Sequence, residues 1–289
     1  MELLDVGKEE VTSAMAHALL LLEQRVRNET LAGHLPTRLK GLDEALCGGI
    51  PFGVLTELVG PAGIGKTQFC LKLSLLASLP ASCGGLDGRV IYIDIESKFR
   101  SKRLIEIGIN SFPEIFLKKG MAQEMAGRIM ILRPTSLSEF AESLYQIKVS
   151  LLQKQVKLLI IDSMAALVLG EHECGTTRQQ ALGWHVSFIK SLAEFSRIPV
   201  VLTNQVRSQS GDESRIYSFQ GQRFIKLAKS PISPPLAFPF KITSSGVVLL
   251  DDDGIEMKGP EINTIQCQGL SMSSLAVNST EYVLCTKNT

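Results

Sequence analysis

The stretch from Gly60 to Thr67, which reads "GPAGIGKT", constrains the fold of this chain more than any other. It matches the pattern G-x-x-x-x-G-K-[ST] at every fixed position, and it lies between an apolar run and a segment with helical periodicity. Its glycines let the backbone wrap closely around phosphate oxygens, Lys66 supplies a positive charge, and the hydroxyl of Thr67 suits Mg²⁺. The motif therefore predicts a nucleoside triphosphate site. Its candidate residues are Gly60, Pro61, Ala62, Gly63, Ile64, Gly65, Lys66, Thr67 and Gln68.

Apolar, β-branched runs alternate with helix-patterned segments over most of the chain. The runs are "VLTELVG", "RVIYIDIE", "RIMILRP", "VKLLIIDS" and "IPVVLTNQ", and the helical segments include residues 66–79, 136–154 and 179–196. This alternation predicts an α/β fold with a mostly parallel sheet covered by helices on both faces. After residue 221 the strand patterns follow one another without helices, so we expect antiparallel strands at an edge of the sheet near the C-terminus.

Two carboxylates at the ends of these runs are candidates for chemistry beside the loop. Asp162 ends the run "KLLIID", where an acid is suited to hold Mg²⁺ through water. Glu96 follows the run "IYIDI", and open α/β sheets bind their ligands at the carboxyl ends of the strands. Glu96 is therefore a candidate to orient and deprotonate water for attack on a γ-phosphate. Asp94 is an alternative, because strand alternation places both carboxylates on the same face.

Bulk composition limits the class of protein. The chain has 289 residues, of which 45% are hydrophobic, and this suits a sizeable folded core. The formal net charge of +1 neither indicates nor excludes binding to nucleic acid. Six cysteines without a regular framework are typical of a reducing compartment. The longest apolar run near the start is far too short to cross a membrane, so we expect a soluble protein without a membrane partner.

The chain divides into three predicted regions. Residues 1–34 form an N-terminal helix and linker, with the helical pattern over residues 9–27. Residues 35–255 form the core, and residues 256–289, rich in Ser, Thr, Asn and Gln with little periodicity, are expected to be a loose tail.

Three features together resemble one family. They are the loop "GPAGIGKT", the run "IYIDIES" followed by "KFRSKRL", and "LLIIDS" followed after a helix by "VVLTNQV". Together they are similar to the ATPase core of the RecA-type recombinases, in the eukaryotic and archaeal branch, over about residues 35–250. The segments "ELVGPAGIGKTQFC" and "GGLDGRVIYIDIESKF" are most similar to the B-type group of eukaryotic recombinase paralogues, in its plant form. The resemblance implies a P-loop NTPase of the RecA type, with residues 1–34 as the remnant of a helical N-terminal domain.

The resemblance also implies roles for single residues. Lys66, Thr67 and Asp162 would serve the phosphates and Mg²⁺ of ATP, and Glu96 would be the catalytic carboxylate. Arg103 would lie over the adenine, unless it is a helix charge paired with a neighbour such as Glu106. Gln205 would sense the γ-phosphate, unless it is a strand-end side chain that bonds loop backbone.

In that family two loops face DNA at the centre of a filament or hetero-oligomer. Here they correspond to residues 169–178 and 206–220, whose candidate DNA contacts are Arg178, Arg207, Arg215 and Tyr217. Plain solvent-exposed loops remain the alternative interpretation. Acidic residues in both loops dilute the attraction, so we expect weak, salt-sensitive binding by this chain alone.

The chain also departs from the family pattern. No Phe precedes Phe52, so the F-x-x-A hook through which the main recombinase joins its neighbour is missing. After the loop that follows Gln205, a strand of the core and part of the loop are predicted to be absent, which indicates a shortened form. A gap in the sheet would leave buried backbone groups unpaired at about 1 to 3 kcal/mol each.

These observations lead to one main hypothesis and three rivals. The chain is expected to be a nuclear, ATP-dependent, DNA-binding factor of homologous recombination and double-strand break repair. It would assist the main recombinase in a hetero-oligomer of paralogues and hydrolyse ATP weakly when DNA is bound. The rivals are a P-loop scaffold that does not hydrolyse ATP, a small-molecule kinase, and an incomplete form with little activity.

Overall fold

The computed structural model describes residues 33–153, 155–164, 166, 175–205, 223–230, 233–256 and 281–287, together with residues 15, 16 and 19. Of the helix expected over residues 9–27, only these last three are described, and they are helical. Among the described residues, no helix is long and apolar enough to span a membrane.

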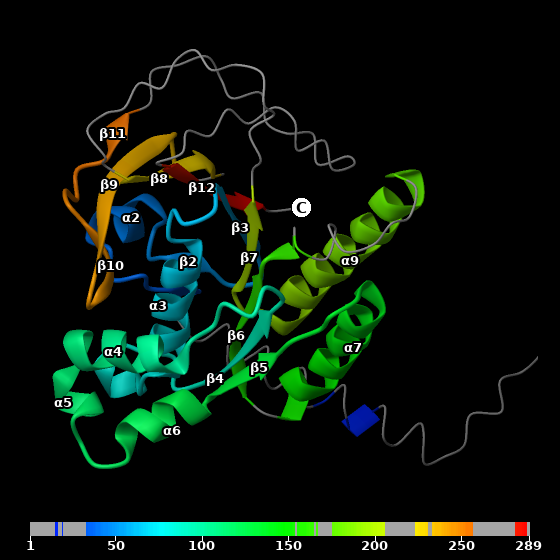
Figure 1. Cartoon of the computed structure of the whole chain (residues 1–289), viewed down its shortest axis with the longest axis horizontal. Coiled ribbons are helices and arrows are strands. Elements are labelled where there is room, and N and C mark those ends of the chain that lie inside the picture. Colours follow the sequence, from blue (N-terminus) through cyan, green and yellow to red (C-terminus); the bar gives the residue numbers. More distant parts are fainter. Residues whose placement is uncertain are drawn as a thin grey trace, which may run out of the picture.

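Five parallel strands form the centre of the molecule (Figure 1). In spatial order they are β5 (Ile129–Leu132), β4 (Arg89–Asp94), β6 (Val156–Asp162), β7 (Val200–Gln205) and β3 (Leu55–Gly60). Each corresponds to one of the apolar runs in the sequence. The parallel sheet of the predicted α/β fold is therefore confirmed.

Helices cover both faces of this sheet (Figure 1). Alternate residues of β4 show the two sides: Tyr92 packs in one apolar cluster, whereas Ile91 and Ile93 pack in the other. The first cluster includes residues of α3 (Lys66–Ser78), α4 (Ser101–Ser111), α5 (Pro113–Phe116) and α6 (Met121–Gly127). The second includes residues of α7 (Leu137–Gln153) and α9 (Gly175–Ser196). Shorter elements complete the described part: β1 (His34–Leu35), α2 (Lys40–Ala45), β2 (Ile50–Pro51) and the 3-10 turn η1 (Ala81–Cys83).

Antiparallel strands extend the sheet beyond β3, as the sequence predicted. β8 (Arg223–Lys229) pairs with β9 (Leu236–Thr243), and β9 pairs with both β10 (Gly246–Leu249) and β11 (Ile255–Glu256). All of these pairings are antiparallel, so the expected edge strands near the C-terminus are present.

One strand corrects two of the sequence-based predictions. Glu281–Lys287 forms β12, which lies between β3 and β8, antiparallel to β3 and parallel to β8. The expected loose tail over residues 256–289 is therefore wrong for this segment. The predicted gap in the sheet is filled, because β12 pairs with backbone groups of both neighbours that would otherwise lack partners. The remaining limits of the three predicted regions stay a prediction.

Candidate functional site

The phosphate loop connects β3 to α3, and two of its glycines have a backbone that other residues rarely adopt. Gly63 has φ +79° and Gly65 has φ +123°. A Cβ atom on Gly65 would lie 2.8 Å from Cδ1 of Ile242, whereas a Cβ atom on Gly63 would meet nothing within 4 Å. Gly65 is therefore required by its backbone conformation, since the contact with Ile242 involves only the end of a flexible side chain. Gly63 leaves open space on the loop where a ligand can approach.

Lys66 begins α3 and folds back over its own loop. Its buried side chain donates from Nζ to the carbonyl oxygens of Gly60, at 2.7 Å, and Pro61, at 2.8 Å. Burial lowers the pKa of Lys66 below its ordinary value, and the positive charge of Lys98 adds to this, although Asp162 and Glu96 act in the opposite direction. Carbonyl oxygens hold the ammonium group beside the place where phosphate oxygens would bind.

Asp162 lies at the end of β6 and accepts hydrogen bonds from three hydroxyl groups. Thr67 Oγ1 and Tyr92 Oη donate to Oδ2 at 2.7 and 2.8 Å, and Thr203 Oγ1 donates to Oδ1 at 2.5 Å. The structure thus brings together Thr67 and Asp162, as predicted. Tyr92 and Thr203 were not predicted, and the signal that could have found them is their position near the ends of the strands on either side of β6.

Glu96 lies just beyond β4 and has hydrogen-bond or ionic partners at both carboxylate oxygens. Oε1 accepts from Ser163 Oγ at 2.6 Å and from Gln205 Nε2 at 2.7 Å, and Oε2 forms an ion pair with Lys98. Burial alone would raise the pKa of Glu96. The hydrogen bonds from Lys98, Ser163 and Gln205 and the charge of Lys98 outweigh burial and hold the pKa below its ordinary value.

Asp94, the alternative to Glu96, has different surroundings. It is fully buried, and it accepts hydrogen bonds from the backbone N–H groups of Lys98 and Phe99, at 2.8 and 3.1 Å, and from Arg133 Nε at 3.1 Å. The expectation that the two carboxylates share a strand face is wrong, because β4 ends at Asp94 and Glu96 lies in the following turn. Asp94 stabilises the turn that carries Glu96.

The carboxamides at the end of β7 have separate partners. Gln205, which pairs with Gly60 across the sheet, bonds the side chain of Glu96 rather than loop backbone. Asn204 donates from Nδ2 to Glu57 Oε1 at 2.6 Å. The structure therefore brings Gln205, Glu96 and the phosphate loop together at one edge of the sheet.

Arg103 is held on α4 by several partners. It forms the ion pair with Glu106 that the alternative interpretation expected, with 2.9 Å between Nη1 and Oε2. Its Nε also donates to Gln68 Oε1 at 2.8 Å, and its Nη2 donates to the carbonyl oxygen of Thr243 at 2.6 Å. Through Gln68 the guanidinium group contacts the helix that begins at the phosphate loop.

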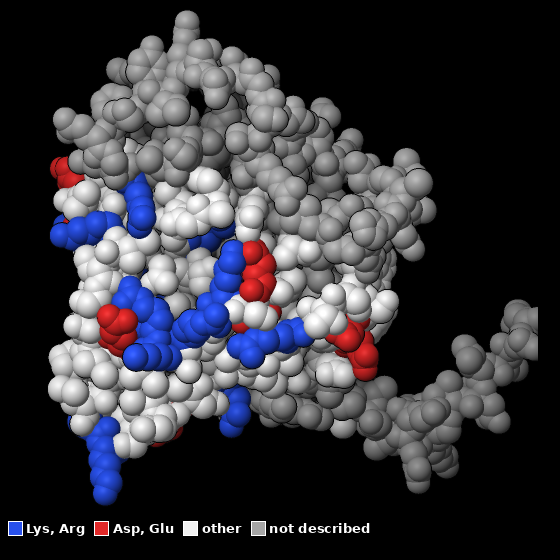
Figure 2. All heavy atoms as spheres, viewed as in Figure 1, with Lys and Arg blue, Asp and Glu red and all other residues white. Residues whose placement is uncertain are grey.

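The predicted DNA-contact residues fall outside the side chains that the structure describes. Arg207, Arg215 and Tyr217 lie outside the described residues, and Arg178 lies in a part of α9 whose side chains are not described. Basic side chains, with some acidic ones among them, gather across the middle of the face that carries α4 and the ends of β4 and β5 (Figure 2). In the described part of the chain, Lys98 and Arg133 each pair with an acidic residue, which reduces the local positive charge.

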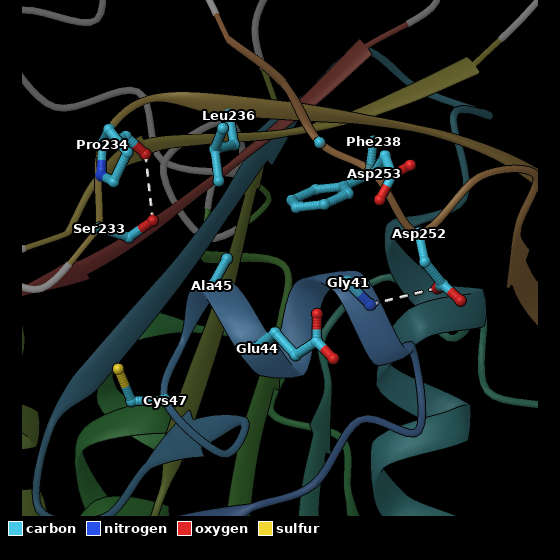
Figure 3. Close-up of a pocket in the computed structure, with 11 residues that line it drawn as sticks. Gly41, Glu44, Ala45, Cys47, Ser233, Pro234, Leu236, Phe238, Asp252 and Asp253 are labelled. Carbon is cyan, nitrogen blue, oxygen red and sulfur yellow. Dashed lines mark hydrogen bonds between the residues drawn. The ribbon is translucent and has the colours of Figure 1, made fainter.

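A recess of about 380 Å³ lies away from the phosphate loop, between α2, β9 and the segment of residues 252–254 that precedes β11 (Figure 3). The N–H group of Gly41 donates to Asp252 Oδ1 at 3.1 Å beside it, and Leu236 and Phe238 form part of its wall. None of its lining residues belongs to the loop from Gly60 to Thr67. This recess is therefore separate from the candidate nucleotide site.

The loop, its lysine, the hydroxyl-bound Asp162 and the parallel sheet define a P-loop protein with the RecA-like α/β fold. The family model described as Rad51 matches residues 27–225, and the chain belongs to this family of nucleotide-binding proteins. The recognition of a RecA-type recombinase paralogue from the sequence is thereby confirmed.

The comparison with individual relatives agrees with the B-type assignment. The "DNA repair protein RAD51 homolog 2" of Arabidopsis thaliana is 58% identical over 322 residues, which cover 94% of this chain and 87% of that protein. Proteins with the same name from Mus musculus and Homo sapiens are 42% and 32% identical, over 60% and 79% of this chain and 51% and 72% of their own lengths. Because the aligned span of 322 residues exceeds this chain of 289, the Arabidopsis protein has segments without a counterpart here.

Proposed function

We propose that this chain is an ATP-binding, DNA-associated factor of homologous recombination and double-strand break repair. It assists the strand-exchange recombinase in the nucleus, as one subunit of a hetero-oligomer of paralogues. The observation that carries the proposal is the joining of the phosphate loop, Asp162, Glu96 and Gln205 at one sheet edge. Membership of the Rad51 family, with relatives named as DNA repair proteins, gives this site its biological setting.

The donor set beside the loop fits a Mg²⁺ ion bound with ATP. Thr67 and Asp162 offer hydroxyl and carboxylate oxygens, which are the ligands that Mg²⁺ prefers, and few protein ligands are needed where phosphates supply the rest. We assign Thr67 as a direct ligand and Asp162 as a ligand through water. The ion would neutralise negative charge on the phosphates, while Lys66 would exchange its carbonyl partners for phosphate oxygens.

Glu96 is the residue we assign to hydrolysis. A water oxygen forms a bond to the γ-phosphorus while the bond to the β–γ bridging oxygen breaks, and ADP leaves with that electron pair. The carboxylate of Glu96 takes a proton from the attacking water. Asp94 is unsuited to this role, because it is fully buried and already accepts hydrogen bonds from the backbone of the turn and from Arg133.

The DNA part of the proposal rests on the two loops after β6 and β7. Arg178, Arg207, Arg215 and Tyr217 are the residues we assign to phosphate and base contacts. Gln205 ends β7, where the second loop begins, and its bond to Glu96 supports communication between the nucleotide and that loop.

A measurement of ATP binding by the full chain, purified with its paralogue partner, tests the nucleotide-binding part of the proposed function. We expect binding of ATP with Mg²⁺, and loss of this binding in Lys66→Ala because the phosphate charge then lacks its counterion. Lys102→Ala is the matched control, since Lys102 is an exposed lysine on α4. Binding that is unchanged in Lys66→Ala, or absent in the wild type, would show that the proposal is wrong.

A second candidate function is a scaffold subunit in which ATP shapes an interface and is not hydrolysed. The engagement of both Glu96 oxygens favours it. Turnover that single-stranded DNA stimulates and that Glu96→Gln abolishes would exclude the scaffold. Tight ATP binding without measurable turnover would support it.

A further inference from the structure

Lys98 is a charged neighbour of Glu96 that the proposed hydrolysis does not use. It lies in the same turn after β4, two residues beyond Glu96, and its ammonium group contacts Oε2. The side chain of Lys98 is 46% exposed and that of Glu96 is 19% exposed. Lys98 is therefore the more exposed partner of the pair, and Glu96 is the more buried one.

We propose that Lys98 is a positioning residue that restrains the Glu96 carboxylate and thereby slows hydrolysis of ATP at this site. This inference rests on the proposed function and names a residue that sets its rate.

Three partners already occupy the carboxylate of Glu96. A carboxylate has about four acceptor positions. Ser163 and Gln205 use Oε1, and Lys98 uses Oε2, so a catalytic water has little acceptor capacity left to bind. Ser163 directly follows β6 and Gln205 ends β7, and together they fix the direction of the carboxylate. Lys98 adds a third restraint, on the oxygen that they leave free.

The same partners lower the basicity of the Glu96 carboxylate. A general base works best when its pKa is close to the working pH, and the partners of Glu96 hold its pKa below the ordinary value of a glutamate. The charged groups that face Glu96 are Lys98 from its own turn and Lys66 from α3. Lys66 is required for the phosphates, so Lys98 is the cation whose removal frees the base without disturbing the loop.

The side chain of Lys98 can be changed without losing the turn. The backbone N–H group of Lys98 donates to Asp94 Oδ1 at 2.8 Å, and that of Phe99 donates to Oδ2 at 3.1 Å. These bonds do not involve the lysine side chain. A substitution at this position therefore tests the ion pair rather than the fold.

The experiment compares ATP hydrolysis by the full chain with its paralogue partner, in single-turnover conditions, for wild type and three variants. Lys98→Met is expected to raise the hydrolysis rate constant by about threefold or more, because a freer and more basic carboxylate accepts the proton more readily. Lys98→Arg keeps the ion pair and should retain the wild-type rate. Lys102→Met, an exposed lysine one turn further along, should also leave the rate unchanged.

A pH profile separates this role from a merely structural one. In Lys98→Met the acidic limb of the rate profile should move to higher pH, because Glu96 loses the cation that lowers its pKa. A rate that is unchanged in Lys98→Met overturns the proposal, and a rate that falls overturns it in favour of a direct contact between Lys98 and the terminal phosphate.

ATP binding, followed separately with a fluorescent ATP analogue, distinguishes failure of the proposed role of Lys98 from failure of the proposed function. If every variant binds the ATP analogue but none hydrolyses ATP, only the proposed role of Lys98 is wrong. If the wild type does not bind the analogue, the proposed function is wrong as well.

Discussion

The side-chain amide of Gln205 donates a 2.7 Å hydrogen bond to Oε1 of Glu96, and so joins the end of β7 to the turn after β4. The two residues are 109 positions apart in the chain, and β6 lies between their strands in the sheet. Any movement of Glu96 toward a bound nucleotide must therefore break or carry this bond. The segment that begins at residue 206 would then respond to the nucleotide through Gln205.

The first prediction concerns Gln205→Ala. Loss of the amide should leave ATP binding nearly unchanged, because the side chain of Gln205 bonds Glu96, and the pairing of Gln205 with Gly60 belongs to the backbone. Hydrolysis should fall by about tenfold or more, since the carboxylate loses a group that orients it. Stimulation by single-stranded DNA should disappear. The measurement is ATP turnover with and without single-stranded DNA, with Gln123→Ala on an exposed position of α6 as the control. Full DNA stimulation in Gln205→Ala would contradict the predicted coupling.

The second prediction concerns the hydroxyl groups around Asp162. Thr203→Val keeps the shape of a fully buried side chain but removes the 2.5 Å hydrogen bond to Oδ1. The free energy of unfolding should fall by about 1 to 3 kcal/mol, because a buried carboxylate loses a donor. Thr56→Val is the matched control: Thr56 is equally buried, and its Oγ1 has no hydrogen-bond partner among the described residues. Urea unfolding of both variants should show a loss in Thr203→Val and little change in Thr56→Val, and equal effects would count against the prediction.

Local patterns were sufficient to predict the phosphate loop and the strands that lead to it. The loop is a contiguous motif whose glycines have a conformational cause, as φ at Gly63 and Gly65 shows. The apolar runs were long enough to predict strands, and their carboxyl ends meet at one edge because parallel strands share a direction. Thr67, Asp162 and Glu96 were therefore singled out from these patterns, and Gln205 from the family resemblance; the roles of all four stay proposals.

Features that depend on strand neighbours could not be predicted in the same way. Tyr92 and Thr203 reach Asp162 because β4 and β7 flank β6, and strand order is set by packing rather than by local sequence. The choice between Asp94 and Glu96 depended on where β4 ends, and strand boundaries are weakly marked in sequence. β12 pairs with β3 more than 200 residues away, so composition around residue 281 indicated only a tail.

The third prediction concerns β12. Removal of residues 281–289 should lower the free energy of unfolding by several kcal/mol, because facing backbone groups of β3 and β8 lose their partners at about 1 to 3 kcal/mol for each buried group. Since β3 leads directly into the phosphate loop, ATP binding should weaken as well. Removal of residues 288–289 alone, which lie beyond β12, is the control. Urea and thermal unfolding of the two truncated chains provide the comparison, and equal midpoints would show that β12 contributes nothing to the sheet.

The fourth prediction concerns Lys72 on α3, whose Nζ donates to the carbonyl oxygen of Val247 on β10 at 2.8 Å. Burial lowers the pKa of Lys72 to about 8, although the charge of Asp43 opposes this, so between pH 8 and 10.5 the folded chain binds fewer protons than the unfolded chain. The contribution of Lys72 to the free energy of unfolding therefore rises with pH through that range. The unfolded chain binds the extra proton, so a lower pH favours unfolding. The total change is of order 1 to 3 kcal/mol.

Comparison with Lys72→Met isolates this effect, because the other titrating groups are common to both proteins. The free energy of unfolding of the wild type, relative to Lys72→Met, should be higher at pH 10 than at pH 7. Lys102→Met provides the control, since an exposed lysine on α4 should show no such pH-dependent difference. Urea unfolding at the two pH values measures all three proteins. A difference between wild type and Lys72→Met that stays constant with pH, or that changes in the opposite direction, would show that Lys72 keeps its proton in the folded chain and that its bond to β10 is made by a fully charged group.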